Sequence, residues 1–291
     1  MTTPAGPGGR AGSAGSLVLV ATPIGNLGDL SSRAIQALTD ADVIACEDTR
    51  RTRHLLSHEG IPAGRRLVTV NDHSEAAQVP TLLARLDRGE RVVLVSDAGM
   101  PGVSDPGERL VAAVAAAGHR VEVVPGPSAA LAALVVSGLP TGRFCFEGFL
   151  PRKGRARAER LAEFAVERRT TIVFEAPHRV HETLSDLAGA LDPLRRVVIA
   201  RELTKVFEEV WRGSLADAVA HLAATEPRGE YVIVLDGAVA PPPAGPGDVD
   251  RALRIRLDAG VDKRTAIAEV AAELGVPKRQ VYEAAISLAA E

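Results

Sequence analysis

Two aspartates in a glycine- and proline-rich segment are the strongest candidates for chemistry in this sequence. Asp97 and Asp105 lie in the segment Ser96–Gly107, which also contains three glycines and two prolines and directly follows the predicted strand Arg91–Ser96. Open α/β sheets bind ligands beyond the carboxyl ends of their strands. Two carboxylates suit a cation or a ribose diol and do not suit phosphate. We therefore expect Asp97 to contact a ligand, whereas Asp105 is equally compatible with a ligand contact and with capping the helix that begins near Pro106.

Two further loops join a predicted strand to a predicted helix. The segment Ala21–Asp29 contains Gly25 and Gly28, which allow a close backbone approach to a ligand or simply a tight turn. In Pro125–Ser128, the serine can cap the following helix while neighbouring backbone amides face a ligand. No predicted strand is followed by G-x-G-x-x-G or by a P-loop. An ordinary Rossmann dehydrogenase or a nucleoside triphosphatase is therefore disfavoured.

Basic residues gather between residues 150 and 160, where five basic side chains accompany one acid. Such a run is either a solvated face or a surface that contacts phosphates. We favour phosphate contact, because the run lies in a glycine-containing loop just after a predicted strand. The residues concerned are Arg152, Lys153, Arg155 and Arg157, with a second patch at Arg50, Arg51 and Arg53. Arg179 and Arg201 are expected either to orient a polyanion or to pair with Glu175 and Glu202.

Strands alternate with helices along the first half of the chain, which predicts an α/β layer with a largely parallel sheet. The predicted strands cover residues 17–21, 43–46, 67–70, 91–96 and 121–124, and the predicted helices cover 31–41, 51–59, 76–88, 108–117 and 128–137. A second α/β unit has predicted strands at 144–149, 171–175, 197–201, 206–212 and 231–236, and helices at about 155–168, 178–190 and 214–224.

The breaks between these patterns predict the domain organisation. We expect a disordered tail at 1–15, an α/β domain at 16–140, a second at 141–238, a proline-rich linker at 239–247 and a small helical module at 248–291. In that module, residues 265–274 and 278–288 flank Gly275-Val-Pro277 and predict a helix-turn-helix.

Composition limits the possible functions. Among 291 residues, 46% are apolar and 24% are charged, with a net charge of −3, so binding of nucleic acid by bulk charge alone is excluded. The longest apolar run, Ala129–Val136, is far too short to span a membrane. Cys46 and Cys145 are too few for a disulfide framework or a four-cysteine zinc site, and we read them as free thiols in a reducing cytoplasm. We expect no membrane association and no structural metal.

Six motifs together resemble the tetrapyrrole-methylase superfamily. They are Ala21–Asp29, Glu47–Arg50, Asn71–Glu75, Ser96–Gly107, Pro125–Ser128 and Phe174–Arg179, with their order and spacing intact over residues 17–238. Within that superfamily, the chain is most similar to enzymes that methylate the ribose 2′-hydroxyl of a cytidine in the decoding region of 16S rRNA, using S-adenosylmethionine. One departure is Ala21, where a glycine commonly opens the first motif.

The resemblance implies two α/β domains with the methyl donor in the cleft between them, and a homodimer. Carried over by motif, the implied donor-binding residues are Pro23, Gly25, Asp97, Gly99, Met100, Pro101, Val103, Ser128, Ala129, Phe174, Leu203, Gly229 and Glu230. The sulfonium of the donor is a cation, so apolar and carbonyl-rich walls suit it better than lysine or arginine. Asp97 could bind the donor's ribose hydroxyls or its amino group.

A ribose hydroxyl is a weak acid, so a positioned base would assist its methylation. Residues of suitable chemistry are Glu47, Asp48, His73, Glu75, Asp105, Glu175 and Lys205. We favour the pair Glu47 and Asp48, which follows a strand and precedes Arg50, with Asp105 as a further candidate. The alternative is that Asp48 pairs with an arginine or caps the next helix.

Two other functions remain open at this point. The same fold could methylate a small tetrapyrrole in corrin biosynthesis, although the basic loop and the C-terminal module argue against it. A non-enzymatic helix-turn-helix regulator would leave the loops of the first 238 residues unexplained. The module carries seven basic and eight acidic residues, so it is no ordinary DNA clamp, although Lys278, Arg279 and Gln280 could touch a phosphate backbone.

Overall fold

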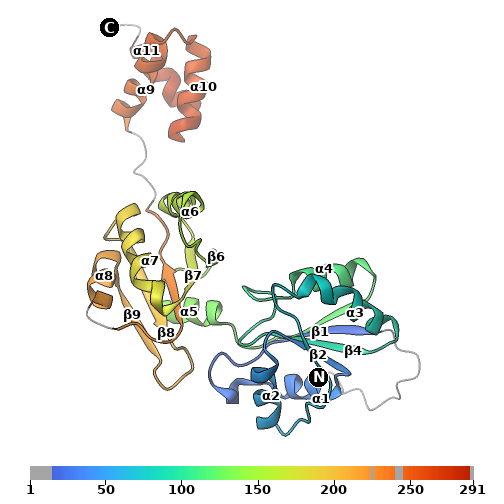
Figure 1. Cartoon of the computed structure of the whole chain (residues 1–291). Coiled ribbons are helices and arrows are strands. Elements are labelled where there is room, and N and C mark those ends of the chain that lie inside the picture. Colours follow the sequence, from blue (N-terminus) through green and yellow to red (C-terminus); the bar gives the residue numbers. More distant parts are fainter. Residues whose placement is uncertain (1–14, 224–225, 240–244, 289–291) are drawn as a thin grey trace, which may run out of the picture. The chain divides into compact units, whose positions relative to one another are not determined.

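The computed structural model describes residues 15–223, 226–239 and 245–288, and the chain forms two compact units, residues 1–238 and 239–291 (Figure 1). The predicted tail lies outside the described residues except for Gly15, and so does most of the predicted linker. The first unit contains two five-stranded sheets, and the second is helical.

The first sheet is entirely parallel in its pairings, as predicted. Its strands are β1 (Ser16–Val20), β2 (Val43–Cys46), β3 (Leu67–Thr69), β4 (Arg91–Val95) and β5 (Arg120–Val124), in the order β3-β2-β4-β1-β5. Because the strands run the same way, the loops that follow them emerge at one edge of the sheet. The three glycine-containing loops after β1, β4 and β5 therefore begin side by side.

Helices cover both faces of this sheet. They are the short 3-10 helix η1 (Leu27–Asp29) and the helices α1 (Ser32–Asp40), α2 (Thr49–His58), α3 (Glu75–Asp87) and α4 (Glu108–Ala116). Alternate strand residues face opposite sides. Ile44 and Val93 pack with α1 and α2, whereas Val43 and Val92 pack with α3 and α4.

The second sheet is mixed. Its strands are β6 (Phe144–Phe149), β7 (Thr170–Glu175), β8 (Arg196–Arg201), β9 (Glu209–Ser214) and β10 (Tyr231–Leu235), in the order β6-β7-β10-β8-β9, with only the β6–β7 pair parallel. The strand predicted from Val206 begins only at Glu209. The preceding residues form a tight turn in which the Glu208 amide donates to the Lys205 carbonyl, and Val206 is 92% exposed.

Helices α6 (Arg155–Val166), α7 (Pro177–Ala190) and α8 (Leu215–Ala223) cover one face of the second sheet, and α5 (Ala129–Ser137) covers the other (Figure 1). The domain boundary predicted at residue 140 had placed α5 in the first domain. Its side chains Ala133 and Leu134 instead pack on Ile172 and Val234 of the second sheet. The third glycine loop therefore connects β5 of the first sheet to a helix that packs on the second sheet.

The helical module contains α9 (Pro246–Asp258), α10 (Lys263–Leu274) and α11 (Lys278–Ser287). Val249, Leu253, Val270 and Val281 form its core. Gly275 ends α10 in the left-handed conformation (φ +62°), and α11 begins three residues later, which confirms the predicted helix-turn-helix. No helix in the described part of the chain is both long and apolar enough to cross a membrane.

Candidate functional site

A cavity of about 300 Å³, called the main cavity below, lies where the glycine loops meet the second sheet. The first-sheet loops contribute Ile24, Ala98, Gly99, Met100, Val103, Ser104 and Asp105, and the start of α5 contributes Ser128 and Ala129. The second sheet and its connections contribute Phe149, Phe174, Glu175, Ala176, Pro177, Ala200, Leu203, Glu230, Tyr231 and Val232.

A second cavity of about 270 Å³ adjoins the first and shares Ile24, Ala98 and Glu230 with it. It is lined by Thr22, Pro23, Gly25, Leu27, Arg51, Thr52, His54, Leu55, Ser96, Asp97 and Lys205 as well. Its walls are more polar than those of the main cavity. An elongated ligand with one apolar and one polar end can span both.

Hydrogen bonds lock the first and second loops together. The amide of Thr22 donates to the Gly99 carbonyl (2.9 Å), and the amide of Gly99 donates back to the Thr22 carbonyl (3.1 Å). The Thr22 hydroxyl also donates to the Ser96 carbonyl at 3.2 Å. The third loop joins them at Gly126, where an added Cβ would lie 2.9 Å from the methyl group of Ala21. These contacts fix the three loops against one another beside the cavity.

The loop after β8 closes the site from the second sheet. The Asn26 amide donates to the Thr204 hydroxyl at 3.1 Å, and a Cβ at Gly25 would lie 2.4 Å from Cγ of Lys205. Thr204 and Glu202 both adopt left-handed backbone conformations (φ +66° and +50°), which non-glycine residues rarely do. Backbone strain of this kind concentrates at functional sites.

Asp105 faces the main cavity and does not cap α4. Two amides at the start of α4 are satisfied by Glu75, whose Oε1 accepts from Gly107 (3.1 Å) and Leu110 (3.0 Å). Burial, followed by the nearby carboxylate of Glu47, raises the pKa of Asp105 to about 7. The capping alternative for Asp105 is therefore wrong, and Glu75 is accounted for as a helix cap.

Asp97 lines the second cavity. Its carboxylate accepts a 3.1 Å hydrogen bond from the Asp48 amide and lies 3.5 Å from the Arg51 guanidinium. Burial raises its pKa above the ordinary value. These contacts hold the carboxylate in place and leave part of it facing the cavity.

The two favoured catalytic candidates, Glu47 and Asp48, line neither cavity. Asp48 caps α2 by accepting from the Arg50 amide (2.8 Å) and pairs with the Arg50 side chain, which lowers its pKa to about 2. Asp48 therefore caps a helix and pairs with an arginine, which was the alternative to a catalytic role. Glu47 acts on the site through its charge, since its carboxylate helps to raise the pKa of Asp105.

Most of the implied donor-binding residues line the two cavities. Those that do so are Pro23, Gly25, Asp97, Gly99, Met100, Val103, Ser128, Ala129, Phe174, Leu203 and Glu230. Pro101 and Gly229 do not. Pro101 is buried, and Gly229 (φ +82°) makes room for Glu202, whose carboxyl group an added Cβ would approach to 2.5 Å.

Several apolar walls of the cavity were not predicted from the sequence, above all Phe149 and Tyr231. Phe149 ends β6 and places its ring 5.8 Å from that of Phe174. Tyr231 begins β10, which pairs with β7 and β8 at the centre of the second sheet. The only available signal was the position of each at a strand end. Glu175, a candidate base, lines the cavity but is held by the Thr183 hydroxyl (2.6 Å) and by Arg179 (3.4 Å).

The predicted RNA-binding residues fall into two groups. Arg50, Arg51, Arg152, Lys153 and Arg155 are exposed, with Arg50 and Arg155 paired to Asp48 and Glu159. Arg157 is buried, so its predicted RNA contact is wrong, whereas Arg179 is half-buried and forms the ion pair with Glu175 that was its alternative.

The contacts of these two arginines within the fold explain both outcomes. Arg157 is 6% exposed and binds Asp186 (2.7 Å), Thr183 (3.0 Å) and the Pro151 carbonyl (3.0 Å). Arg179 pairs with Glu175 and donates to the Leu150 carbonyl. Arg201 pairs with Glu209 rather than with Glu202.

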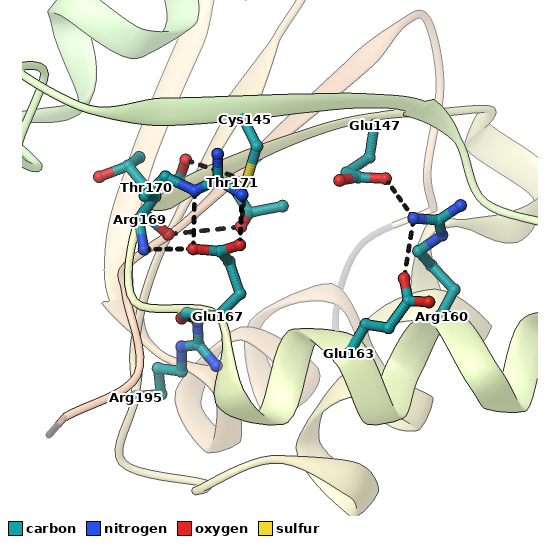
Figure 2. A network of polar contacts seen from close by, with 9 residues as sticks. All are labelled: Cys145, Glu147, Arg160, Glu163, Glu167, Arg169, Thr170, Thr171 and Arg195. Carbon is teal, nitrogen blue, oxygen red and sulfur yellow. Dashed lines mark hydrogen bonds and ion pairs between the residues drawn. The ribbon is translucent and has the colours of Figure 1, made fainter. Parts of the chain in front are cut away.

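Figure 2 shows further arginines that are engaged within the fold near the starts of β6 and β7. Arg160 lies between Glu147 (3.0 Å) and Glu163 (2.8 Å), and Arg169 pairs with Glu167 (2.6 Å). Arg195 donates to the Phe164 and Glu167 carbonyls. These pairs border a third hollow of about 970 Å³, in which acids and bases alternate, and we assign it no ligand.

The charge of the main cavity fits a cationic methyl donor. Among the described residues that line it, the charged ones are Asp105, Glu175 and Glu230, all acidic, and most of the others are apolar. A sulfonium gains from such walls and would be repelled by lysine or arginine. Within the described residues, no group of three or more histidine, cysteine, aspartate or glutamate side chains is arranged to hold a metal ion.

Comparison with known families gives two matches. Residues 16–219 match the model of the tetrapyrrole (corrin/porphyrin) methylases, and residues 243–289 match the RsmI C-terminal HTH domain. Solved structures agree on the fold. The methyltransferase CobJ is 21% identical, with a TM-score of 0.58 over 80% of this chain and 98% of its own. Uroporphyrin-III C-methyltransferase from Thermus thermophilus, solved with S-adenosyl homocysteine, is 23% identical, with a TM-score of 0.54 over 76% and 96%.

Curated relatives match over nearly their full length. A protein of Synechocystis is 44% identical over 95% of this chain and 99% of its own. Proteins of Mycobacterium tuberculosis (strain CDC 1551) and Escherichia coli O157:H7 are 48% and 43% identical, over 94% of this chain in each case and 95% and 96% of their own. All three are named ribosomal RNA small subunit methyltransferase I. The chain therefore belongs to the tetrapyrrole methylase family and, within it, to the family of ribosomal RNA small subunit methyltransferase I.

Proposed function

We propose that this protein is an S-adenosylmethionine-dependent methyltransferase that methylates the ribose 2′-hydroxyl of a cytidine in the decoding region of 16S rRNA. The observation that carries the proposal is the main cavity, with its acidic and apolar lining and with Asp105 freed from helix capping by Glu75. The names of the relatives supply the substrate class.

The two adjoining cavities supply the donor site. Gly99, Ser128 and Leu203 border the main cavity and Asp97 borders the second, so a donor spanning both meets apolar walls and the fixed carboxylate of Asp97. S-adenosylmethionine, when bound, supplies an electrophilic methyl group. The chain contributes orientation, because the hydrogen-bonded loops fix the cavity walls in advance.

Asp105 is the residue best suited to accept the proton of the attacking hydroxyl. A base works best when its pKa lies near the working pH, and burial and Glu47 raise the pKa of Asp105 to about 7. Asp48, whose pKa is held at about 2 by Arg50, is a poor proton acceptor. Asp105 therefore replaces the Glu47–Asp48 pair as the proposed base.

RNA contact is assigned to the exposed cations of the first unit. Arg152 and Lys153 are exposed in the loop between β6 and α6, and Arg51 borders the second cavity. Such side chains neutralise phosphates and position the substrate. The small ribosomal subunit is the expected carrier of this RNA, and a cytoplasmic location is part of the proposal.

A homodimer is part of the proposal. Two elements of the first unit carry exposed apolar side chains: α5 has Leu131, Val135 and Val136, and the edge strand β5 has Val121 and Val123. Exposed apolar side chains on a helix face or an edge strand are candidates for an interaction surface. Analytical ultracentrifugation should find a dimer, and Val135→Glu, at a side chain 68% exposed, should shift it to monomer; a wild-type monomer at micromolar concentration would refute the dimer.

The test of function offers two acceptors to the same enzyme. Purified protein with labelled S-adenosylmethionine is incubated with small subunits that lack the modification and, separately, with a reduced tetrapyrrole. Label on the RNA supports the proposal. Label on the tetrapyrrole alone would replace it with corrin biosynthesis.

A further inference from the structure

The charges of the helical module are segregated. Four of its acids form ion pairs with neighbouring arginines. Arg251 pairs with Asp248, Arg256 pairs with Glu269 and Glu273, and Arg279 pairs with Glu283. The near balance of acids and bases in the module therefore does not describe its whole surface.

Three other cations of the module border one groove. A hollow of about 410 Å³ between α10 and α11 is lined by Lys263, Arg264, Ile267, Ala268, Lys278 and Tyr282. Within the described residues, no carboxylate forms an ion pair with any of the three basic side chains. Asp262, the nearest acid in sequence, turns to the helix backbone and accepts from the amides of Arg264 and Thr265.

The other residues that line this groove are apolar side chains and one exposed aromatic ring. Tyr282 is 54% exposed, and it stands on α11 one turn beyond Lys278. Ile267 and Ala268 lie on the facing helix α10. An exposed aromatic ring beside cations is the arrangement with which proteins bind single-stranded nucleic acid, by stacking a base and neutralising the adjoining phosphates.

We propose that this groove binds an unpaired nucleotide of the RNA substrate, with its base stacked on Tyr282 and its flanking phosphates held by Lys263, Arg264 and Lys278. The proposal rests on the proposed function, since it takes RNA as the substrate. It assigns no role to Arg279, a predicted phosphate contact beside Lys278, because Glu283 engages its guanidinium at 2.9 Å.

Single-stranded RNA is favoured over duplex DNA for two reasons. A recognition helix in the major groove must present its outer face to the bases. The exposed Arg279–Glu283 pair on α11 would bring the Glu283 carboxylate to the DNA, which is unfavourable. A stacking ring also requires an unstacked base, which loops of RNA provide and an intact duplex does not.

The experiment measures the affinity of the full-length protein for a fluorescent RNA oligonucleotide containing the decoding-region loop. Tyr282→Leu and Lys278→Gln should each raise Kd roughly tenfold. Tyr282→Phe keeps a stacking ring and should bind as the wild type does. Arg279→Gln, the matched control one residue from Lys278, should also leave Kd unchanged.

Two further readouts separate this proposal from the proposed function. Thermal unfolding and calorimetric donor binding establish that the variants fold and keep the main cavity intact. If the wild type methylates RNA but Tyr282→Leu binds it with unchanged Kd, the groove proposal fails alone. Tighter binding of a DNA duplex than of the RNA loop would also overturn it, whereas absence of methyl transfer with Tyr282-dependent RNA binding would overturn only the enzymatic assignment.

Discussion

The Glu75 carboxylate accepts a 3.1 Å hydrogen bond from the Gly107 amide and thereby takes the capping position that the sequence had offered to Asp105. Glu75 and Gly107 are separated by 32 positions along the chain. Because Glu75 satisfies the start of α4, the Asp105 carboxylate faces the main cavity. The assignment of the base follows from this one contact.

Asp105→Asn should abolish the pH dependence that the proposed mechanism requires. Since the pKa of Asp105 is about 7, the wild-type rate should rise as the pH increases through 7, because the deprotonated carboxylate accepts the proton. The variant should lose roughly 10²–10⁴-fold in kcat. Asp29→Asn, at an exposed residue outside both cavities that does not contribute to the raised pKa of Asp105, serves as the control. An Asp105→Asn enzyme with wild-type kcat and pH profile would remove Asp105 from the mechanism.

Asp105 also makes stability depend on pH. Its folded-state pKa of about 7 exceeds the unfolded value of 3.8, so the fold favours the protonated form. Its contribution to stability is therefore present at acidic pH and is lost as the pH rises through 7. Denaturant unfolding at pH 5.5 and 8.5 should show Asp105→Asn gaining stability relative to wild type at the higher pH; equal differences at both values would contradict the raised pKa.

Asp97→Ala should weaken binding of S-adenosylmethionine. Asp97 borders the second cavity and is held by the Asp48 amide, so its removal takes away a fixed polar partner of the donor. The expected loss is roughly 1–3 kcal/mol by titration calorimetry. Asp29→Ala, outside both cavities, is the control. Unchanged affinity in Asp97→Ala would exclude this carboxylate from the donor site.

Gly126→Ala should destabilise the protein, and Ala21→Gly should restore it. The new Cβ would lie 2.9 Å from the Ala21 methyl group, too close for two carbon atoms. Overpacking of this kind costs about 1–3 kcal/mol. The double variant removes the clash, so a double-mutant cycle of unfolding free energies should show strong positive coupling. Additive effects would mean that the two loops do not touch as described.

Arg152→Gln combined with Lys153→Gln should weaken RNA binding and flatten its salt dependence. Both side chains are exposed, and the slope of log K against log salt should fall by about 0.7 for each phosphate of single-stranded RNA that is no longer neutralised. Arg196→Gln, exposed but paired with Asp236, is a matched control. An unaltered slope would identify the loop as an ordinary solvated surface.

Arg157→Ala should act on stability and not on RNA affinity. Its guanidinium is buried and binds Asp186, Thr183 and the Pro151 carbonyl. Breaking such a pair costs on the order of 3 kcal/mol. Thermal unfolding should register the loss, while the folded fraction binds RNA with the wild-type salt slope. A stable variant with a reduced slope would return Arg157 to the RNA surface.

Features set by local sequence were predictable, and features set by distant contacts were not. The apolar runs around Val93 and Ile233 predicted strands, and Gly25 and Gly99 predicted loops near a ligand, because strand burial and tight turns leave a local signature. Arg157 looked like its exposed neighbours because its burial depends on Asp186 in another helix. The side on which α5 packs depends on the second sheet, which the helix's own sequence does not describe.

The most direct test of the central claim is to locate the methyl group on the RNA. Small subunits that lack the modification are treated with the enzyme and labelled S-adenosylmethionine, and the RNA is digested with nucleases and with alkali. We predict label on one decoding-region cytidine within a dinucleotide that resists alkali, because a methylated 2′-oxygen cannot attack the adjacent phosphate. Label on a base, with alkali-sensitive linkages throughout, would contradict this prediction.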